Sequence, residues 1–379
     1  MTGFILTVLI VYGLLNFYVI RRGWQALAGA QTGRWIFLGI AIFFVLSFPL
    51  SRMAARILPH FLTTFLSYTG AFSIAVMFYA FFLLLVIDLS RLLNALFHIF
   101  PRFIVENPHK AGLVSFWSIL GLIVLILIGG FMAAVQPRVR RLDLTLERRA
   151  GTLERLNIVM VSDIHLSSIW RDGHLKKIVA EINGLEPDLV LLPGDIVDMD
   201  VSQSEEEKMV VTLQAIHAPR GVFAVTGNHE YYSGAAKAIA YLSKAKVRVL
   251  QDEWVRIDEA LYLVGRKDRA AARMGEERKP LGEIMQGVDK NLPLILMDHQ
   301  PFHLEEAEQN GIDLQVSGHT HAGQLFPLTL INKRLYEQSW GYWRRGKTQY
   351  FISCGVATWG IPIRTGSISE IIQIRTTFR

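Results

Sequence analysis

The chain has 379 residues, 51% of them hydrophobic, and a mean hydropathy of +0.31, which is high for a water-soluble protein. The net charge of +6 comes from residues 1–135, which hold eight of the 39 Lys and Arg and two of the 33 Asp and Glu, leaving 31 of each sign in 136–379. A balanced C-terminal part excludes the broad cationic face of a nucleic-acid binder, so no nucleic-acid partner is expected, and the single cysteine, Cys354, excludes an intramolecular disulfide.

Four apolar runs predict membrane-spanning helices. A helix needs about 20 apolar residues to cross a bilayer core, and the first, third and fourth runs meet that need. The second run is shorter, but Arg34 and Arg52 flank it and their side chains can reach the interface. A cleaved signal peptide followed by core helices is the alternative, but Arg21 and Arg22 follow the first run, whereas a signal peptide carries its charge before it. Residues 1–135 are therefore predicted to form a transmembrane region of about four helices, from the runs 2–20, 35–50, 61–87 and 111–135.

The composition changes after Val135 to that of a globular domain, predicted to span 136–379. Leu142, Leu144 and Leu146 alternate with polar residues, which is the period of a half-buried strand. Later runs of Val, Ile and Leu are continuous, as in strands buried on both faces. This pattern predicts an α/β domain with helices covering its sheets. The helix-like stretches lie at 172–184, 204–217, 234–245 and 303–310.

Each of five apolar runs in this domain is followed at once by polar side chains. "LNIVMVSDIH", for example, ends in an Asp-x-His pair, and "IDLQVSGHTH" ends in a His-x-His pair. Ligand sites in open α/β sheets lie beyond the carboxyl ends of the strands, so we expect these side chains to share one site. Turn-capping residues are the alternative for any one of them, but not for seven at matched strand ends. The seven are Asp163, His165, Asp195, Asn228, His299, His319 and His321.

Imidazole, carboxylate and amide donors without a thiolate are typical of a site for Mn, Zn, Fe or Ni. Residues i and i+2 of an extended chain point to the same side, so each pair can aim two ligands at one place. Seven donors exceed what one ion takes, which predicts two divalent ions bridged by the carboxylate of Asp195. Two ions about 3.5–4 Å apart can activate a water and bind the oxygens of an in-line displacement at phosphorus. His229 is the candidate acid for the leaving oxygen, and Asp198 and Glu230 are predicted hydrogen-bond acceptors behind the ligands.

The ordered blocks D-x-H, GD-x-x-D, GNHE, a lone His and GHTH-x-GQ resemble the calcineurin-like metallophosphoesterase superfamily. The tail "YFISCGVATWGIPIRTGSISEIIQIR" resembles the end of its membrane-associated bacterial branch, with Cys354 where a polar residue is expected. The resemblance implies a four-layer α/β/β/α sandwich, and it implies that His229 contacts the phosphoryl group. It assigns Asp163, His165, Asp195 and His321 to one ion and Asp195, Asn228, His299 and His319 to the other.

The sequence therefore predicts a membrane-tethered di-metal phosphoesterase that hydrolyses a phosphoester or pyrophosphate bond. A tether suits an amphiphilic substrate, so a lipid- or envelope-linked small molecule and membrane lipid are the expected partners. One alternative is a UDP-diacylglucosamine-type pyrophosphatase of lipid A synthesis, and another is a non-catalytic metal-binding regulatory module on a membrane transporter. Arg364, Arg344 and Arg345 are predicted substrate contacts. The stretch 332–347 is interpreted either as a surface loop and strand or as a rim that meets lipid headgroups.

Basic residues near the spans predict the orientation in the membrane, because short cytoplasmic loops are enriched in Lys and Arg. The first and third connecting loops carry six such residues, whereas the second loop carries Arg52 and Arg56. With the N-terminus outside, four spans place the domain on the envelope side of a bacterial plasma membrane. Five arginines after the fourth span argue the other way, but they begin a folded domain. The six are Arg21, Arg22, Arg34, Arg91, Arg102 and Lys110, and the five are Arg138, Arg140, Arg141, Arg148 and Arg149.

Overall fold

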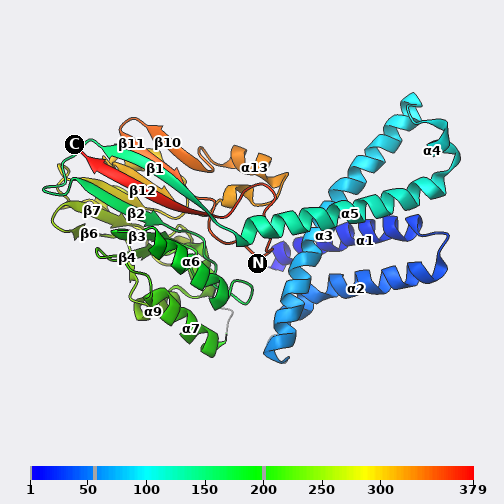
Figure 1. The fold of residues 1–379 in the computed structure, drawn as a ribbon, viewed down its shortest axis with the longest axis horizontal. Helices are drawn as coiled ribbons and strands as arrows, with labels where there is room; N and C mark the ends of the chain where they lie inside the picture. Colours follow the sequence, from blue (N-terminus) through cyan, green and yellow to red (C-terminus); the bar gives the residue numbers. More distant parts are fainter. Residues whose placement is uncertain (1, 54–57, 199–201) are drawn as a thin grey trace. The chain divides into compact units, whose positions relative to one another are not determined.

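The computed structural model describes residues 2–53, 58–198 and 202–379, so Arg56 of the second loop lies outside the described residues (Figure 1). The chain forms two compact units, Met1–Gly129 and Gly130–Arg379. The last six residues of the fourth long helix belong to the second unit.

Among the described residues, four helices are long and apolar enough to cross a membrane, which confirms that prediction. The third of these helices continues past residue 87, where the predicted apolar run ends. Asp88 therefore lies inside the helix rather than at its end. Asp88 forms ion pairs with Arg91, at 3.4 Å, and with Arg22 of the first helix. The helices are α1 (Thr2–Ala26), α2 (Gln31–Met53), α3 (His60–Phe97), the short α4 (Arg102–Glu106) and α5 (Pro108–Val135).

The C-terminal unit is built on two six-stranded mixed sheets. In the first, the order is β1 (Arg138–Leu146), β12 (Glu370–Phe378), β2 (Arg155–Met160), β3 (Leu189–Pro193), β4 (Val222–Val225) and β5 (Arg248–Val249). In the second, it is β10 (Gly341–Arg345), β11 (Thr348–Ile352), β9 (Leu314–Ser317), β8 (Leu294–Met297), β7 (Leu261–Gly265) and β6 (Glu253–Ile257). The strands β2 to β5 run parallel, as do β7, β8, β9 and β11.

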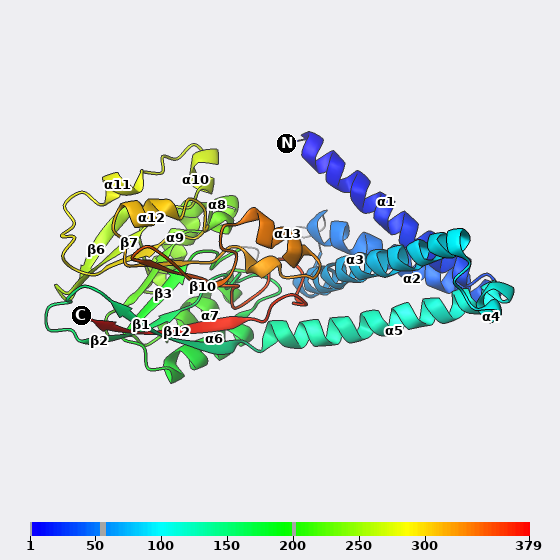
Figure 2. The same ribbon diagram turned by 90° about the horizontal axis from the view of Figure 1, so that it is seen from above.

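Helices cover the outer face of each sheet, so the unit has the predicted four α/β/β/α layers. On the first sheet lie α6 (Asp172–Gly184), α7 (Gln203–Gln214) and α9 (Ala235–Lys244). On the second lie α11 (Leu281–Ile284) and α12 (Glu305–Gln309). Figure 2 shows α6 on one side of the strands and α11 and α12 on the other. The short α8 (Asn228–Ser233), α10 (Ala270–Arg273), η1 (His321–Gly323) and α13 (Leu328–Leu335) lie in connections.

The continuous apolar runs follow from this layering. In β2, Ile158 and Met160 point between the sheets, whereas Val159 packs with the first helix layer. In β7, Leu263 points between the sheets and Val264 packs with the second helix layer. Because both faces of each central strand are buried, both sets of positions must be apolar. The strands' carboxyl ends, where polar residues begin, are thereby brought to one edge.

Candidate metal centre

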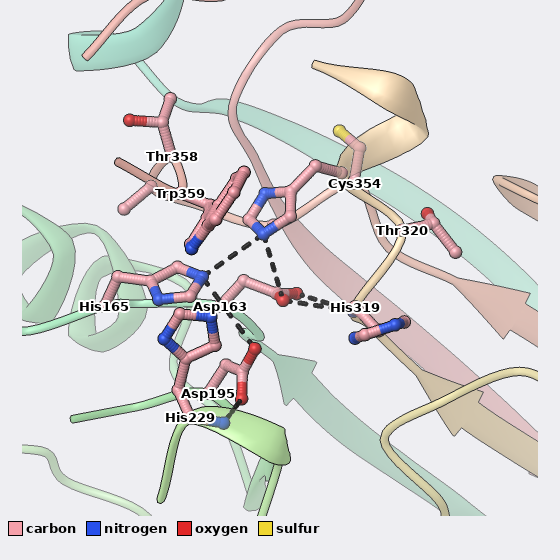
Figure 3. Close-up of polar contacts among 12 residues, drawn as sticks. Asp163, His165, Asp195, His229, His319, Thr320, Cys354, Thr358 and Trp359 are labelled. Carbon is pink, nitrogen blue, oxygen red and sulfur yellow. Dashed lines mark hydrogen bonds and ion pairs between the residues drawn. The ribbon is translucent and has the colours of Figure 1, made fainter. Parts of the chain in front are cut away.

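The seven predicted donors come together at that edge. Asp163 and His165 follow β2, Asp195 follows β3, and Asn228 follows β4 as the first residue of α8. His299 follows β8, and the two histidines after β9 complete the set. Figure 3 shows Asp163, His165, Asp195 and His319 around a common space.

The backbone at these positions is unusual. Asp163, His165, Asp195, His319 and His321 all have positive φ, between 49° and 72°. The prediction that an extended backbone points Asp163 and His165 to the same side is therefore wrong. The two side chains do share a side, but left-handed turns of the backbone place them there. Non-glycine residues in this region cost about 1–3 kcal/mol each and cluster at functional sites. Hydrogen bonds hold the turns, since the N–H groups of Asp163 and His165 donate to the carbonyls of Gly194 and Asp195, at 3.1 and 3.0 Å.

The side chains form two donor clusters, which a third group of His165, Asp195 and His229 links. In the first, Asp163, His165 and His321 place ligand atoms within 4.8 Å of one another. In the second, Asp195, His299 and His319 do the same. Oδ2 of Asp195 lies 3.2 Å from Nε2 of His299 and 4.0 Å from Nε2 of His165. Asp195 therefore stands between the two clusters.

These donors fit divalent cations. Oδ1 of Asn228 is buried without a hydrogen bond to any described residue. An unsatisfied buried polar atom costs about 1–3 kcal/mol, so this atom has unused capacity to bind. The Nε2 atoms of His165 and His321 lie only 3.2 Å apart, which suits two donors that face the same ion.

Burial and neighbouring charges set the protonation of the donors. Burial alone would lower the pKa of His165, but the carboxylates of Asp198, Asp195 and Asp163 outweigh it and raise that pKa to about 9. Burial and the charge of His299 lower the pKa of His319 to about 3. Burial raises the pKa of Asp195, but its histidine neighbours lower it further, to well below the usual value. Asp195 is therefore ionised, as a bridging ligand must be.

Two carboxylates support the donors from behind, as predicted. Oδ1 of Asp198 lies 3.1 Å from Nδ1 of His165 and 2.8 Å from Nδ1 of His229, so one carboxylate orients both rings. The carboxylate of Glu230 accepts the backbone N–H groups of Asp195 and Gly227, at 3.1 and 2.7 Å, and those of the two residues after Asp195. Glu230 thereby ties the loop after β3 to the loop after β4.

Three glycines lie beside the donors, one at a sharp turn and two where a side chain would collide with a donor carboxylate. Gly194 has a φ of +89°, which glycine adopts readily and which lets the chain turn sharply after β3. At Gly227 and Gly318 the reason is space: a Cβ would collide with the side chain of Asp195 at the first and of Asp163 at the second.

Of the three predicted substrate arginines, only Arg364 touches a donor: its Nη2 lies 3.4 Å from Nδ1 of His321. Arg364 is 1% exposed and donates through Nη2 to the carbonyl oxygens of Cys354 and Gly355, at 2.6 and 3.1 Å, so its contact with phosphate stays a prediction. Cys354 itself is fully buried, and burial raises the pKa of its thiol. Arg344 and Arg345 stand at the far end of β10, because Arg345 pairs with Thr348 at the start of β11, whereas the donors follow strand ends. The structure does not bring these two arginines to the donors.

Two aromatic residues that lie beside His229 were not predicted from the sequence. The ring centroids of Tyr232 and Trp359 lie 5.8 and 6.5 Å from that of His229, and the two side chains are 57% and 61% exposed. Tyr232 is one helical turn after His229 in α8, a spacing that the sequence contains. Trp359 is 130 positions away, and only the tertiary fold brings it here (Figure 3).

Comparisons with known proteins agree with this geometry. Residues 156–323 match the model of the calcineurin-like phosphoesterase family. An uncharacterized metallophosphoesterase of Helicobacter pylori is 31% identical over 249 residues, covering 65% of this chain and 66% of that protein. A transmembrane protein with metallophosphoesterase domain from Bos taurus is 32% identical, covering 71% and 64%. An uncharacterized metallophosphoesterase of Aquifex aeolicus is 33% identical, covering 58% and 84%. The chain thus spans slightly less than two thirds of the first two relatives.

Proposed function

Because the chain belongs to the calcineurin-like phosphoesterase family, we propose that it is a membrane-tethered, metal-dependent phosphoesterase. It hydrolyses a phosphoester or pyrophosphate bond of a phosphorylated small molecule. The observation that carries the proposal is the position of Asp195 between two donor clusters, one with Asp163, His165 and His321 and the other with His299 and His319. Two divalent ions, of Mn, Zn, Fe or Ni, fit such a set.

When bound, divalent ions supply Lewis acidity toward phosphoryl oxygens and acidify water. The protein supplies the proton for the leaving oxygen. Asp198 holds Nδ1 of His229 at 2.8 Å, which leaves Nε2 as the atom that carries this proton. A ring nitrogen of His229 lies within 4.8 Å of ligand atoms of His165 and Asp195, so the acid stands beside the reacting centre. The exposed rings of Tyr232 and Trp359 flank it.

A lipid- or envelope-linked substrate fits this protein best, because four spans hold the domain beside a bilayer and an amphiphilic substrate is concentrated there. We place the domain on the envelope side of a bacterial plasma membrane, from the count of basic residues in the loops. A pyrophosphatase acting on a nucleotide-linked lipid is a distinct outcome of the test below.

The test is a screen of the purified full-length protein with Mn²⁺ against nitrophenyl monoesters and diesters, phospholipids and lipid-linked diphosphates. Asp195→Ala should lose both ions and essentially all turnover, because it removes the shared ligand. Elemental analysis reports the ions, and Asp143→Ala, an exposed carboxylate on β1, is the matched control. Normal metal content in Asp195→Ala would refute the two-ion assignment. A metal-loaded wild-type protein that cleaves none of the substrates would point to a non-catalytic module.

A further inference from the structure

The helix α13 presents its apolar side chains to solvent, whereas Thr329 and Asn332 face the protein. Leu328, Leu330, Ile331 and Leu335 are 38–66% exposed, and Phe326 just before the helix is 55% exposed. We call these five residues the apolar face of α13. A surface helix of a soluble domain has the opposite arrangement, so this face is built to meet an apolar partner.

The inward side of α13 packs on the turn that carries His321. Nδ2 of Asn332 donates to the carbonyl oxygen of Thr320, at 3.1 Å, and Thr329 is buried. A Cβ on Gly323 would stand 2.7 Å from the backbone of Thr329, so helix and turn touch closely. The apolar face is therefore attached rigidly to the donor cluster.

A chain of contacts joins α13 to the end of α5 within the same unit. The N–H of Phe326 donates to Oγ1 of Thr365, at 2.9 Å, and the N–H of Arg364 donates to the carbonyl oxygen of Gly130, at 2.8 Å. Oγ of Ser369 donates to the carbonyl oxygen of Ala134, at 2.8 Å. The last six residues of α5 thus dock on the loop 363–369 that holds the start of α13, and both ribbons lie at the same end of the unit (Figures 1 and 2).

The length of α5 places that end at a membrane surface. Its 28 residues span about 42 Å at 1.5 Å per residue, whereas a bilayer core is about 30 Å thick. Lys110 keeps the first turn outside the core, so about 20 residues from Ala111 fill it and Gly130–Val135 reach the opposite headgroups. The hydrogen bonds described above connect the start of α13 to this end of α5. Lys333 and Arg334 add two cations to the last turn of α13.

We propose that the apolar face of α13 inserts into the lipid bilayer at the headgroup level and holds the donor site close to the membrane. The bilayer is the occupant because the same unit carries the end of a spanning helix next to this face. The proposal rests on the span and on these contacts, not on the proposed activity.

The test uses the full-length chain in nanodiscs of phosphatidylcholine and phosphatidylglycerol, with an environment-sensitive fluorophore on Ile331→Cys. Wild-type protein is the blank, because its one thiol, Cys354, is fully buried. Lys290→Cys is the matched control, since Lys290 is exposed and precedes β8, at the end of the sheet opposite the donors. Leu335→Cys repeats the measurement one turn along α13.

With doxyl-labelled phosphatidylcholine in the nanodisc, the dyes at 331 and 335 should shift to the blue and lose most of their fluorescence, whereas the dye at 290 should keep it. Two results would overturn the proposal. A blue-shifted dye at 331 without quenching means that protein covers the face, either the membrane-spanning helices or a second copy. A dye at 331 that behaves like the one at 290 means that water covers it.

Discussion

Asp198 fixes one ring nitrogen of His229, and no described residue forms a hydrogen bond with the other. Asp198 contacts Nδ1, and the backbone N–H of the same histidine donates to Oδ1 of Asp195, at 2.9 Å. Ring and backbone are thus both tied to groups that the donor cluster positions. This is the arrangement that a proton donor needs, because its orientation has been settled before substrate arrives.

His229→Gln should keep both ions and lower turnover by roughly 10²–10⁴, the range for general acid catalysis. The loss should be smaller for nitrophenol esters, because a good leaving group needs little protonation. Asp198→Asn should give a partial loss with the same dependence on the leaving group, since Asp198 acts through the orientation of His229. Equal losses for good and poor leaving groups would exclude the acid role, and elemental analysis separates this effect from lost metal.

At single residues, the sequence predicted the identity of the donors better than their geometry. Asp163, Asp195 and His299 all follow apolar runs, and parallel strands end at one edge, so their convergence could be expected. The positive φ of His165 could not, because no residue in its neighbourhood is a glycine and the turn is imposed by hydrogen bonds to the next loop. The role of Arg364 also depends on tertiary contacts, since its partners are the ring of His321 and the backbone carbonyls of Cys354 and Gly355.

At the scale of elements, burial decides which predictions hold. The stretch 172–184 has the helical period and an apolar side that packs on the first sheet, and the structure has α6 at those residues. In α13 the residues Leu328, Ile331 and Leu335 also recur at the helical period, but they are exposed rather than buried. Its inward residues are Thr329 and Asn332, which pack on the turn that carries His321, and that tertiary contact could not be read from the sequence.

Reversing the charge of basic residues on α13 and on β10 should affect the hydrolysis of a lipid substrate differently. Reversing Lys333 and Arg334 to Glu should weaken activity on lipid substrates in vesicles, by about 1 kcal/mol per cation near an anionic surface. Reversing Arg344 and Arg345 should leave it unchanged, because these lie at the far end of β10. Both variants should cleave a soluble nitrophenyl ester at the wild-type rate. A loss in the β10 variant equal to that in the α13 variant would show that general surface charge, not α13, meets the lipid.

For the whole molecule, the ion pair between Arg22 and Asp88 bears on topology. It joins the end of α1 to the last third of α3, so these two helices run in the same direction. Four helices that alternate in direction require this arrangement. An even number of spans then puts the N-terminus and the C-terminal unit on the same side of the membrane.

A reporter fused after Arg379 should show that this side is the envelope side. Of the arginines after the fourth span, Arg140 pairs with Glu370 at 3.1 Å and lies over the ring of Trp340, and Arg148 pairs with Asp313 at 3.1 Å. They are parts of a folded sheet rather than a free basic tail, so their weight in the orientation rule is small. Alkaline phosphatase at the C-terminus should therefore be active and a fluorescent protein there dark. A bright fluorescent fusion with an inactive phosphatase fusion would place the unit in the cytoplasm, and a nucleotide-linked lipid would then be the substrate to test first.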